Sequence, residues 1–237
     1  MNIGILQCDN VQEKFVSQHG DYPAMFSAFL KQVDPSLTFT LYNAKASELP
    51  EHIDACDAYL ITGSRHGVND PLPWISTLET FVKKLHAAQK KVLGICFGHQ
   101  LIAKALGGKV IKSPKGWGVG MSQNNLLQTK PWMTPNQEHF NLLVSHQDQV
   151  VKLPDGAEAL AGSDFCPFYM MQIENTLTIQ GHPEFSKAYS EALLRERQTM
   201  LTSHCYEEGL KSLEQTKDDA LIAQWFMNFL HYPIQNK

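Results

Sequence analysis

The sequence predicts an α/β fold in which a mostly parallel central sheet carries helices on both faces. Two features lead to this prediction. Short apolar runs alternate with amphipathic segments of helical periodicity through the first half of the chain, which is the pattern of strand–helix–strand units. Several of those runs are apolar throughout, as strands that are covered on both faces must be.

The elements of the first half follow one another in that order. Residues 2–8 form an apolar strand, and Asp21 stands where it can cap the first helix. A second strand is expected near residues 37–42, and a buried third strand at residues 58–62. Residues 74–88 then form a helix whose apolar side chains recur at helical spacing.

In the second half of the chain, the alternation of strands and helices gives way to successive short strands. Beyond Gly108 the sequence predicts short strands, with a hairpin turn at Glu174 and Asn175. These strands are expected near residues 119–127, 142–145, 157–162, 169–173 and 176–180. We expect one domain over residues 1–237, made of a core over residues 1–185 and a helical extension over residues 186–237.

The extension is predicted to hold two amphipathic helices. Ser186 is placed to cap a long helix that reaches about His204. Residues 216–219 resemble a capping box in front of a second helix. That helix carries a strong apolar stripe of Leu221, Ile222, Trp225, Phe226, Phe229 and Leu230. The stripe suits packing on the domain's own sheet, or a surface for a partner or a second copy in a homodimer.

Composition narrows the class of protein. Hydrophobic residues make up 43% of the 237 residues and charged residues 19%, the balance of an ordinary globular domain. The formal net charge is −4 and lysine and arginine do not cluster, so we expect no nucleic-acid partner. No window approaches the apolar length of a membrane span, and no export signal is visible. We therefore expect no membrane partner.

The cysteine pattern indicates free thiols. The chain has five cysteines, an odd number, and no two of them have metal-ligand spacing. Free thiols are typical of the reducing cytoplasm, which is the expected location. A metal site built from His139 and His146 fails on spacing and on the lack of nearby carboxylates. We expect neither a metal nor a cofactor.

The stretch over residues 91–108 contains the chain's best candidate nucleophile. An apolar strand leads into Cys96, which Gly94 and Gly98 flank, and an apolar helix follows and ends at Gly107 and Gly108. A residue at such a strand-to-helix turn is exposed at the edge of the sheet, as in a nucleophile elbow. The helix N-terminus favours the thiolate, which is the nucleophilic form of cysteine.

A base for this nucleophile lies further along the chain. In the sequence Gly-His-Pro-Glu, His182 can take the thiol proton, and Glu184 can hold the other ring nitrogen. His146 is a second candidate base, although no similar pattern surrounds it. A hydrogen-bonded loop histidine is the alternative explanation for His146.

The two motifs together resemble the class I glutamine amidotransferase family, in particular its free-standing members of the GMP-synthase-like type. The motifs are Gly-Ile-Cys-Phe-Gly-His-Gln over residues 94–100 and Gly-His-Pro-Glu over residues 181–184, and the resemblance covers roughly residues 1–185. It implies a flavodoxin-like architecture. It also implies a Cys-His-Glu triad that cleaves the γ-amide of glutamine through a γ-glutamyl thioester and releases ammonia.

The resemblance also implies roles for residues outside the triad. Gly63 and Phe97 match positions whose N–H groups form the oxyanion hole, and Gln100 matches a position that holds the glutamine substrate. Residues 145–148 resemble a substrate-side loop of the family. The residues of that loop expected to bind substrate are Ser145, His146 and Asp148. From its place after the third strand, Arg65 is expected to be free to meet a substrate carboxylate.

Three functions remain open on the sequence alone. The chain either releases ammonia for a separate synthetase subunit or acts alone as a γ-glutamyl peptide hydrolase. No G-x-x-x-x-G-K-[ST] motif is present, so ATP-driven chemistry on an acceptor is not expected of this chain. The third possibility is a non-catalytic sensor on the same scaffold, against which the intact Cys96, His182 and Glu184 argue.

Overall fold

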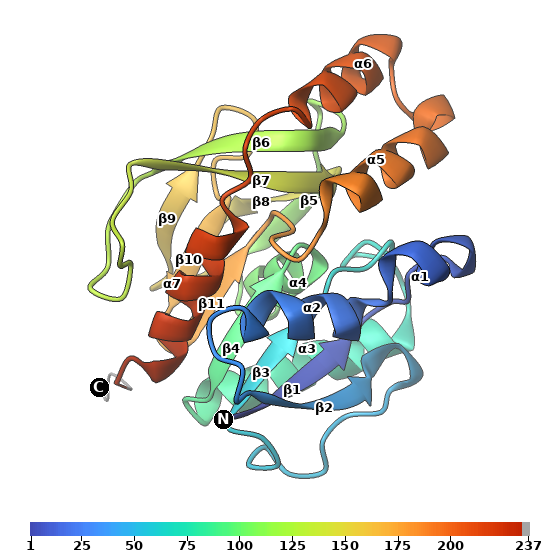
Figure 1. Cartoon of the computed structure of the whole chain (residues 1–237). Coiled ribbons are helices and arrows are strands. Elements are labelled where there is room, and N and C mark those ends of the chain that lie inside the picture. Colours follow the sequence, from blue (N-terminus) through green and yellow to red (C-terminus); the bar gives the residue numbers. More distant parts are fainter. Residues whose placement is uncertain (234–237) are drawn as a thin grey trace.

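A mixed nine-stranded sheet forms the centre of the computed structural model, which describes residues 1–233. The strand order is β2-β1-β3-β4-β11-β10-β9-β6-β7 (Figure 1). The strands are β1 Asn2–Gln7, β2 Thr38–Asn43, β3 Ala58–Ile61, β4 Lys91–Ile95, β6 Gly118–Leu126, β7 His139–His146, β9 Glu158–Gly162, β10 Met170–Ile173 and β11 Thr176–Ile179. The α/β fold class predicted from the sequence is confirmed.

The first five strands of that order are parallel. β1 pairs with β2 and β3, and β4 pairs with β3 and β11, each in parallel register. Counted along the chain, the five strands have the order 2-1-3-4-5, which is the flavodoxin-like order. Because parallel strands share one direction, the carboxyl ends of β1, β3, β4 and β11 meet at one edge of the sheet.

The other half of the sheet is antiparallel. β10 and β11 form the expected hairpin, whose turn contains Glu174 at φ 49°. β9 pairs with β10 and β6, and β6 pairs with β7 over eight residue pairs. The sequence did not predict a second, two-stranded sheet of β5 (Lys109–Lys112) and β8 (Asp148–Lys152).

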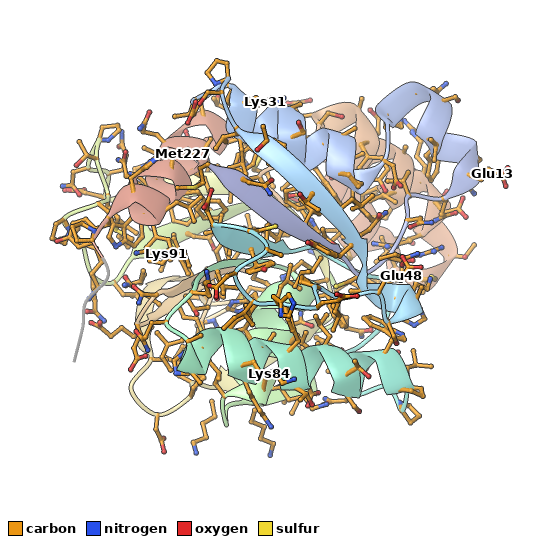
Figure 2. All side chains as sticks on the ribbon, turned by 90° about the horizontal axis from the view of Figure 1, so that it is seen from below. Glu13, Lys31, Glu48, Lys84, Lys91 and Met227 are labelled. Atoms are coloured by element: carbon orange, nitrogen blue, oxygen red, sulfur yellow. The ribbon has the colours of Figure 1, made fainter. Side chains whose placement is uncertain are left out.

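Helices cover both faces of the parallel half. The helices are α1 Glu13–His19, α2 Tyr22–Lys31, α3 Pro73–Ala87, α4 Phe97–Ala105, α5 Lys187–Glu196, α6 Ser203–Ser212 and α7 Asp219–His231. α3 and α4 bury their apolar sides in one core cluster, whereas α2 and α7 bury theirs in another across the sheet. Figures 1 and 2 show this three-layer arrangement, with α3 on the face opposite α2 and α7.

The alternation of side chains along the strands supplies both clusters. In β3, Leu60 faces the cluster that contains α2 and α7, and Tyr59 and Ile61 face the cluster that contains α3 and α4. All five residues of β4 are buried. A strand buried on both faces is apolar at nearly every position, as β4 is apart from Lys91 at its start, which is why these runs are recognisable in the sequence.

Two expectations about helices near the ends of the chain are wrong. Asp21 does cap a helix, by accepting from the Tyr22 N–H, but that helix is α2, and α1 precedes it. The long helix expected from Ser186 to about His204 is two helices. α5 ends at Glu196, a 3₁₀ turn follows, and the Thr202 side chain caps α6 by accepting from the Cys205 N–H. This break lets α6 turn back over β6.

The apolar stripe of the last helix packs on the chain's own sheet. Trp225, Phe226 and Phe229 in α7 are buried with the strands and with α2. The capping box expected over residues 216–219 is not formed, because α7 begins only at Asp219 and its N-cap is Asp218, whose carboxylate accepts from the Asn141 N–H at 2.7 Å and makes no cap bond. None of the helices within residues 1–233 is long and apolar enough to cross a membrane.

We expect His99 to weaken the fold below neutral pH. This α4 histidine is fully buried, and its Nδ1 lies 2.7 Å from Thr178 Oγ1. Burial lowers the pKa of His99 to about 3, below the value of about 6.5 in an unfolded chain. The unfolded state therefore binds the extra proton first, and stability is lost as pH falls from about 6.5 toward 3. From pH 7.5 to pH 5 this loss is about 2 kcal/mol.

Urea unfolding at pH 7.5 and pH 5 measures this contribution. His99→Asn should reduce the difference in unfolding free energy between the two pH values by about 2 kcal/mol relative to the unsubstituted protein. The same substitution at the exposed His52 serves as the control and should leave the difference unchanged. If His99→Asn retains the whole difference, His99 is not the buried neutral group described here.

Candidate active site

Cys96 stands at a strained turn between β4 and α4. Its backbone has φ 51° and ψ −99°, a conformation that costs free energy and is common at functional sites. The Cys96 N–H donates to the Ile179 carbonyl at 2.9 Å, and its own carbonyl accepts from the Gln100 N–H at 3.1 Å. A Cβ on Gly98 would lie 2.4 Å from the Ile61 carbonyl oxygen, so only glycine permits α4 to begin this close to β3.

His182 and Glu184 form a buried pair just after β11. His182 Nδ1 lies 2.7 Å from Glu184 Oε1, and the side chains are only 5% and 0% exposed. The His182 N–H donates to the Leu143 carbonyl at 2.8 Å, and the imidazole stacks on Phe185 at 3.9 Å between ring centroids. With Nδ1 occupied by the carboxylate, Nε2 is the nitrogen that remains for another partner.

The fold brings His182 beside Cys96 and Gly63. A Cβ built on Gly63 would lie 2.9 Å from His182 Cε1 and 3.8 Å from Cys96 Cβ. The three residues follow β3, β4 and β11, which are neighbours in the parallel half of the sheet. The residues predicted from two distant motifs therefore meet at one point.

The charge state of His182 follows from these neighbours. Burial by itself lowers the pKa of this imidazole, but the negative charges of Glu184 and of a Cys96 thiolate outweigh burial and raise the pKa above its ordinary value. The imidazolium is therefore favoured at neutral pH. An imidazolium between a carboxylate and a thiolate can hold a proton ready for a leaving group.

A cavity of about 400 Å³ opens beside Cys96 and Phe97. The structure places all four residues expected to bind substrate in its wall: Gln100, Ser145, His146 and Asp148. Gln100 Nε2 donates to the Asp148 carbonyl at 2.8 Å and to Gln180 Oε1 at 3.0 Å. Ser145 and His146 belong to β7 and Asp148 begins β8, so the stretch expected as a loop is the junction of two strands.

His146 differs from His182 in its surroundings. It is buried, its Nδ1 lies 3.1 Å from the Asp148 carbonyl, and burial lowers its pKa to about 4. It is therefore neutral at physiological pH. His139 and His146 stand at opposite ends of β7, and residues 1–233 contain no group of three potential metal ligands.

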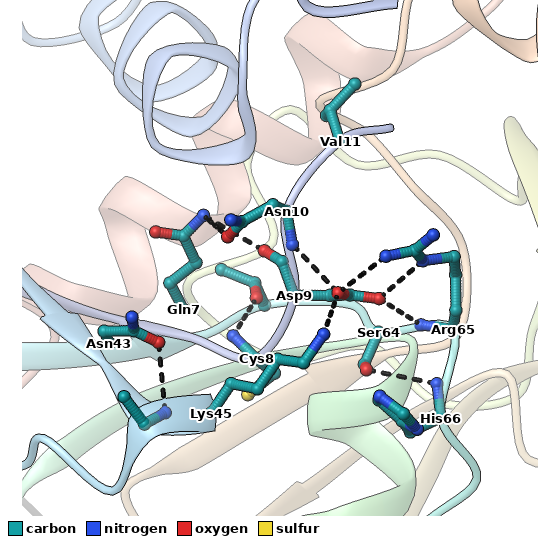
Figure 3. Close-up of polar contacts among 12 residues, drawn as sticks. Gln7, Cys8, Asp9, Asn10, Val11, Asn43, Lys45, Ser64, Arg65 and His66 are labelled. Carbon is teal, nitrogen blue, oxygen red and sulfur yellow. Dashed lines mark hydrogen bonds and ion pairs between the residues drawn. The ribbon is translucent and has the colours of Figure 1, made fainter. Parts of the chain in front are cut away.

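Asp9 ties down the loop that carries Gly63. The buried Asp9 carboxylate accepts from the Arg65 N–H at 3.1 Å and from Arg65 Nε at 2.8 Å, and Lys45 Nζ lies 2.8 Å away (Figure 3). Burial alone raises the pKa of Asp9, but the bonds from Arg65 and Lys45 outweigh it and hold the carboxyl well below its usual range. Thr62 Oγ1 also accepts from the Cys8 N–H at 2.9 Å.

These contacts correct the expectation for Arg65. Its guanidinium lines the cavity but is paired with Asp9, so it is not free for a substrate carboxylate. Sequence reasoning overlooked Asp9, although its position directly after β1 was a usable signal, since ligands gather at the carboxyl ends of parallel strands.

Arg197 is a second residue of the cavity wall that the sequence did not indicate. It follows α5 in the C-terminal extension, and its side chain reaches the cavity beside Ser145 and Trp117. No local pattern in the sequence connects it with Cys96.

The chain is similar to several known proteins. Residues 25–198 match the family model described as "Glutamine amidotransferase class-I". A glutamine amidotransferase-like protein of Schizosaccharomyces pombe is 31% identical over 97% of this chain and 98% of its own length. Gamma-glutamyl peptidase 4 of Arabidopsis thaliana is 35% identical over 71% of this chain and 70% of its own.

A solved structure shows the same fold. The crystal structure of a glutamine amidotransferase from Thermotoga maritima superposes with a TM-score of 0.78, at 16% identity, over 97% of this chain and 98% of that one. With a family model that matches well over half of the chain, and with the fold it implies, this protein belongs to the class I glutamine amidotransferase family.

Proposed function

We propose that this chain hydrolyses γ-glutamyl amides with Cys96 as nucleophile, His182 as proton carrier and Glu184 as the group that orients His182. The observation that carries the proposal is the position of His182, which Glu184 holds at Nδ1 while the ring lies against Gly63 and Cys96. A thiolate needs such a partner to deliver a proton to its leaving group.

The reaction has two steps. The Cys96 thiolate attacks the γ-carbonyl carbon, and the C–N bond breaks as the His182 imidazolium gives its proton to the departing nitrogen. This step leaves a γ-glutamyl thioester and a neutral imidazole. Water then attacks the thioester and His182 takes a proton from it. Glutamate leaves, and the thiolate–imidazolium pair is restored.

The backbone N–H groups of Phe97 and Gly63 are proposed to stabilise the oxyanion of each step. The Phe97 N–H belongs to the first turn of α4, where it has no helical acceptor. Gly63, which lies beside His182 and Cys96, would supply the second N–H. Each donor of this kind is worth on the order of 3 kcal/mol in the transition state.

We favour an amine rather than ammonia as the leaving group. The cavity of about 400 Å³ is in the range that holds a drug-sized ligand, which exceeds what one free amino acid needs. The similarity to an Arabidopsis gamma-glutamyl peptidase supports the same choice. The glutamyl end would contact Gln100, Ser145, His146 and Asp148. Glutamine hydrolysis for a separate synthetase is the second candidate, which the similarity to a glutamine amidotransferase-like protein supports.

Glutamate release by the purified chain tests this proposal. With γ-glutamylglycine and with glutamine as substrates, we expect faster turnover of the peptide. Cys96→Ala should reduce kcat by roughly 10⁴- to 10⁶-fold. A glutamine-like diazo-ketone should label Cys96 alone among the five cysteines, and peptide mapping identifies the labelled residue. Labelling spread over the other cysteines, or no turnover of either substrate, would contradict the proposal and favour a binding protein.

Variants of the buried pair test the role of Glu184. Glu184→Gln removes the charge that raises the pKa of His182, so the alkaline limb of the kcat/KM profile should move to lower pH. We expect kcat to fall by roughly 10⁴-fold for Glu184→Gln and by roughly 10⁶-fold for His182→Ala. If His182→Ala were the milder change, the base would be another residue, and His146 would be the next to test.

The Asp9 contacts predict an effect on kcat from outside the cavity. Asp9→Asn removes the charge that holds the Arg65 N–H and guanidinium, and the loop with Gly63 should lose its precise position. We expect kcat to fall by at least about 10-fold with little change in KM. Complete removal of one oxyanion donor lowers kcat by about 10²- to 10³-fold, and a misplaced donor should cost less. Lys45→Met breaks the other ion pair of Asp9 and should cost much less. Equal losses in the two variants would show that only the fold is affected.

A further inference from the structure

The C-terminal extension builds one wall of the cavity. α6 packs against the start of β6, where Ser212 Oγ accepts from the Met121 N–H at 2.8 Å and Cys205 Sγ lies 3.5 Å from the Trp117 carbonyl. A Cβ on Gly120, whose φ is 78°, would lie 2.5 Å from the Gly209 carbonyl oxygen. This close backbone contact holds Trp117 at the cavity. All of α6 lies beyond the residues that match the family model.

Arg197 lies in the same wall and is held in place by two neighbours. Its Nη1 donates to Ser145 Oγ, and its guanidinium carbon lies 5.3 Å from the centroid of the Trp117 ring. The guanidinium is half-buried and faces the cavity that Cys96 lines. A planar cation stacked on an aromatic ring and fixed by one hydrogen bond is already oriented before a ligand binds.

Arg197 differs from the other arginines in its charge balance. The chain has three arginines; Arg65 pairs with Asp9, and Arg195 pairs with Glu191 at 2.6 Å. Within residues 1–233, Arg197 has no carboxylate partner, and its Nε and Nη2 make no hydrogen bond. The edge that a guanidinium uses for bidentate contact with a carboxylate is therefore open.

We infer that Arg197, supported by Trp117 and Ser145, is a carboxylate-binding residue of the substrate pocket. The inference rests on the proposed γ-glutamyl amide hydrolysis. A γ-glutamyl peptide offers two such groups, the α-carboxylate of the glutamyl unit and the C-terminal carboxylate of the leaving group. Either would meet the open edge of the guanidinium, and substrates that differ in one carboxylate distinguish them.

A purely structural role is the competing explanation, since the bond to Ser145 also ties the end of α5 to β7. A structural role predicts that loss of Arg197 lowers thermal stability and reduces activity equally with every substrate. A carboxylate-binding role predicts that loss of Arg197 raises KM and leaves kcat largely unchanged. The choice among variants follows from this difference.

The experiment compares Arg197→Met with two other variants. Arg195→Met is the matched control. It removes the same charge two residues earlier in the chain, where the side chain is exposed and pairs with Glu191. Arg197→Lys keeps the positive charge but loses the planar guanidinium, which can bind a carboxylate with two parallel hydrogen bonds. KM and kcat are measured for γ-glutamylglycine and for γ-glutamyl-p-nitroanilide, whose leaving group has no carboxylate. Thermal unfolding of each variant reports on the fold.

For Arg197→Met we expect KM for γ-glutamylglycine to rise about 10- to 100-fold, as loss of a charge-assisted hydrogen bond predicts. Arg197→Lys should show a smaller rise, and Arg195→Met none. If KM for the nitroanilide is unchanged, Arg197 binds the leaving-group carboxylate; if it rises equally, Arg197 binds the α-carboxylate. An unchanged KM for both substrates, or a loss confined to kcat and thermal stability, would overturn the inference.

A binding measurement separates this inference from the proposed function. Cys96→Ala and the double variant Cys96→Ala, Arg197→Met are titrated with γ-glutamylglycine by calorimetry. If the chain turned over no γ-glutamyl amide but Cys96→Ala bound the dipeptide at least about 10-fold more tightly than the double variant, the proposed catalysis would fail and the carboxylate site would stand. Equal affinities would overturn the carboxylate site alone.

Discussion

The contact between His182 and Glu184 is the interaction on which the rest of the site depends. Both side chains are almost completely buried, and an isolated charge at such a position would be strongly unfavourable. The pair is tolerable because the opposite charges compensate each other at 2.7 Å. Removal of either partner would leave the other charge buried and without compensation.

The parallel half of the sheet makes that arrangement possible. β4 delivers Cys96, and β11, its direct neighbour, delivers His182 and Glu184. β3 pairs with β4 on the other side and delivers Gly63. Since these strands run in one direction, their loops all emerge at one edge, where the N-terminus of α4 also begins. The antiparallel half adds β7, whose Leu143 carbonyl anchors the backbone of His182.

The site's surroundings are held by contacts between distant parts of the chain. Asp9 fixes the loop that carries Gly63, and Arg197 joins the end of α5 to Ser145. Arg65 and Arg197 both line the cavity, but their situations differ. Arg65 is paired with Asp9, whose single negative charge it shares with Lys45, whereas Arg197 has no carboxylate partner among the described residues. This contrast is the basis for expecting the substrate to bring a carboxylate to Arg197.

The sequence by itself determined the fold class and indicated Cys96, His182 and Glu184 as candidate site residues, because each of these features is encoded in a short local pattern. Apolar strands such as β4 and the glycines around Cys96 follow from local requirements of burial and of a tight turn. His182 and Glu184 are two residues apart, so their pairing could also be predicted from the sequence. The prediction of a mostly parallel sheet needed only the alternation of strands and helices.

The tertiary structure alone decided the contacts that join distant residues. Arg65 meets Asp9 across 56 positions, Asp218 meets Asn141 across 77, and Arg197 meets Ser145 across 52. The first contact overturned the expectation of a free Arg65, and the second occupies the carboxylate of the N-cap residue of α7. Periodicity and capping patterns indicate contacts only between residues within one or two helical turns of each other along the chain. The partner of a charged side chain depends on which elements the completed fold places beside it.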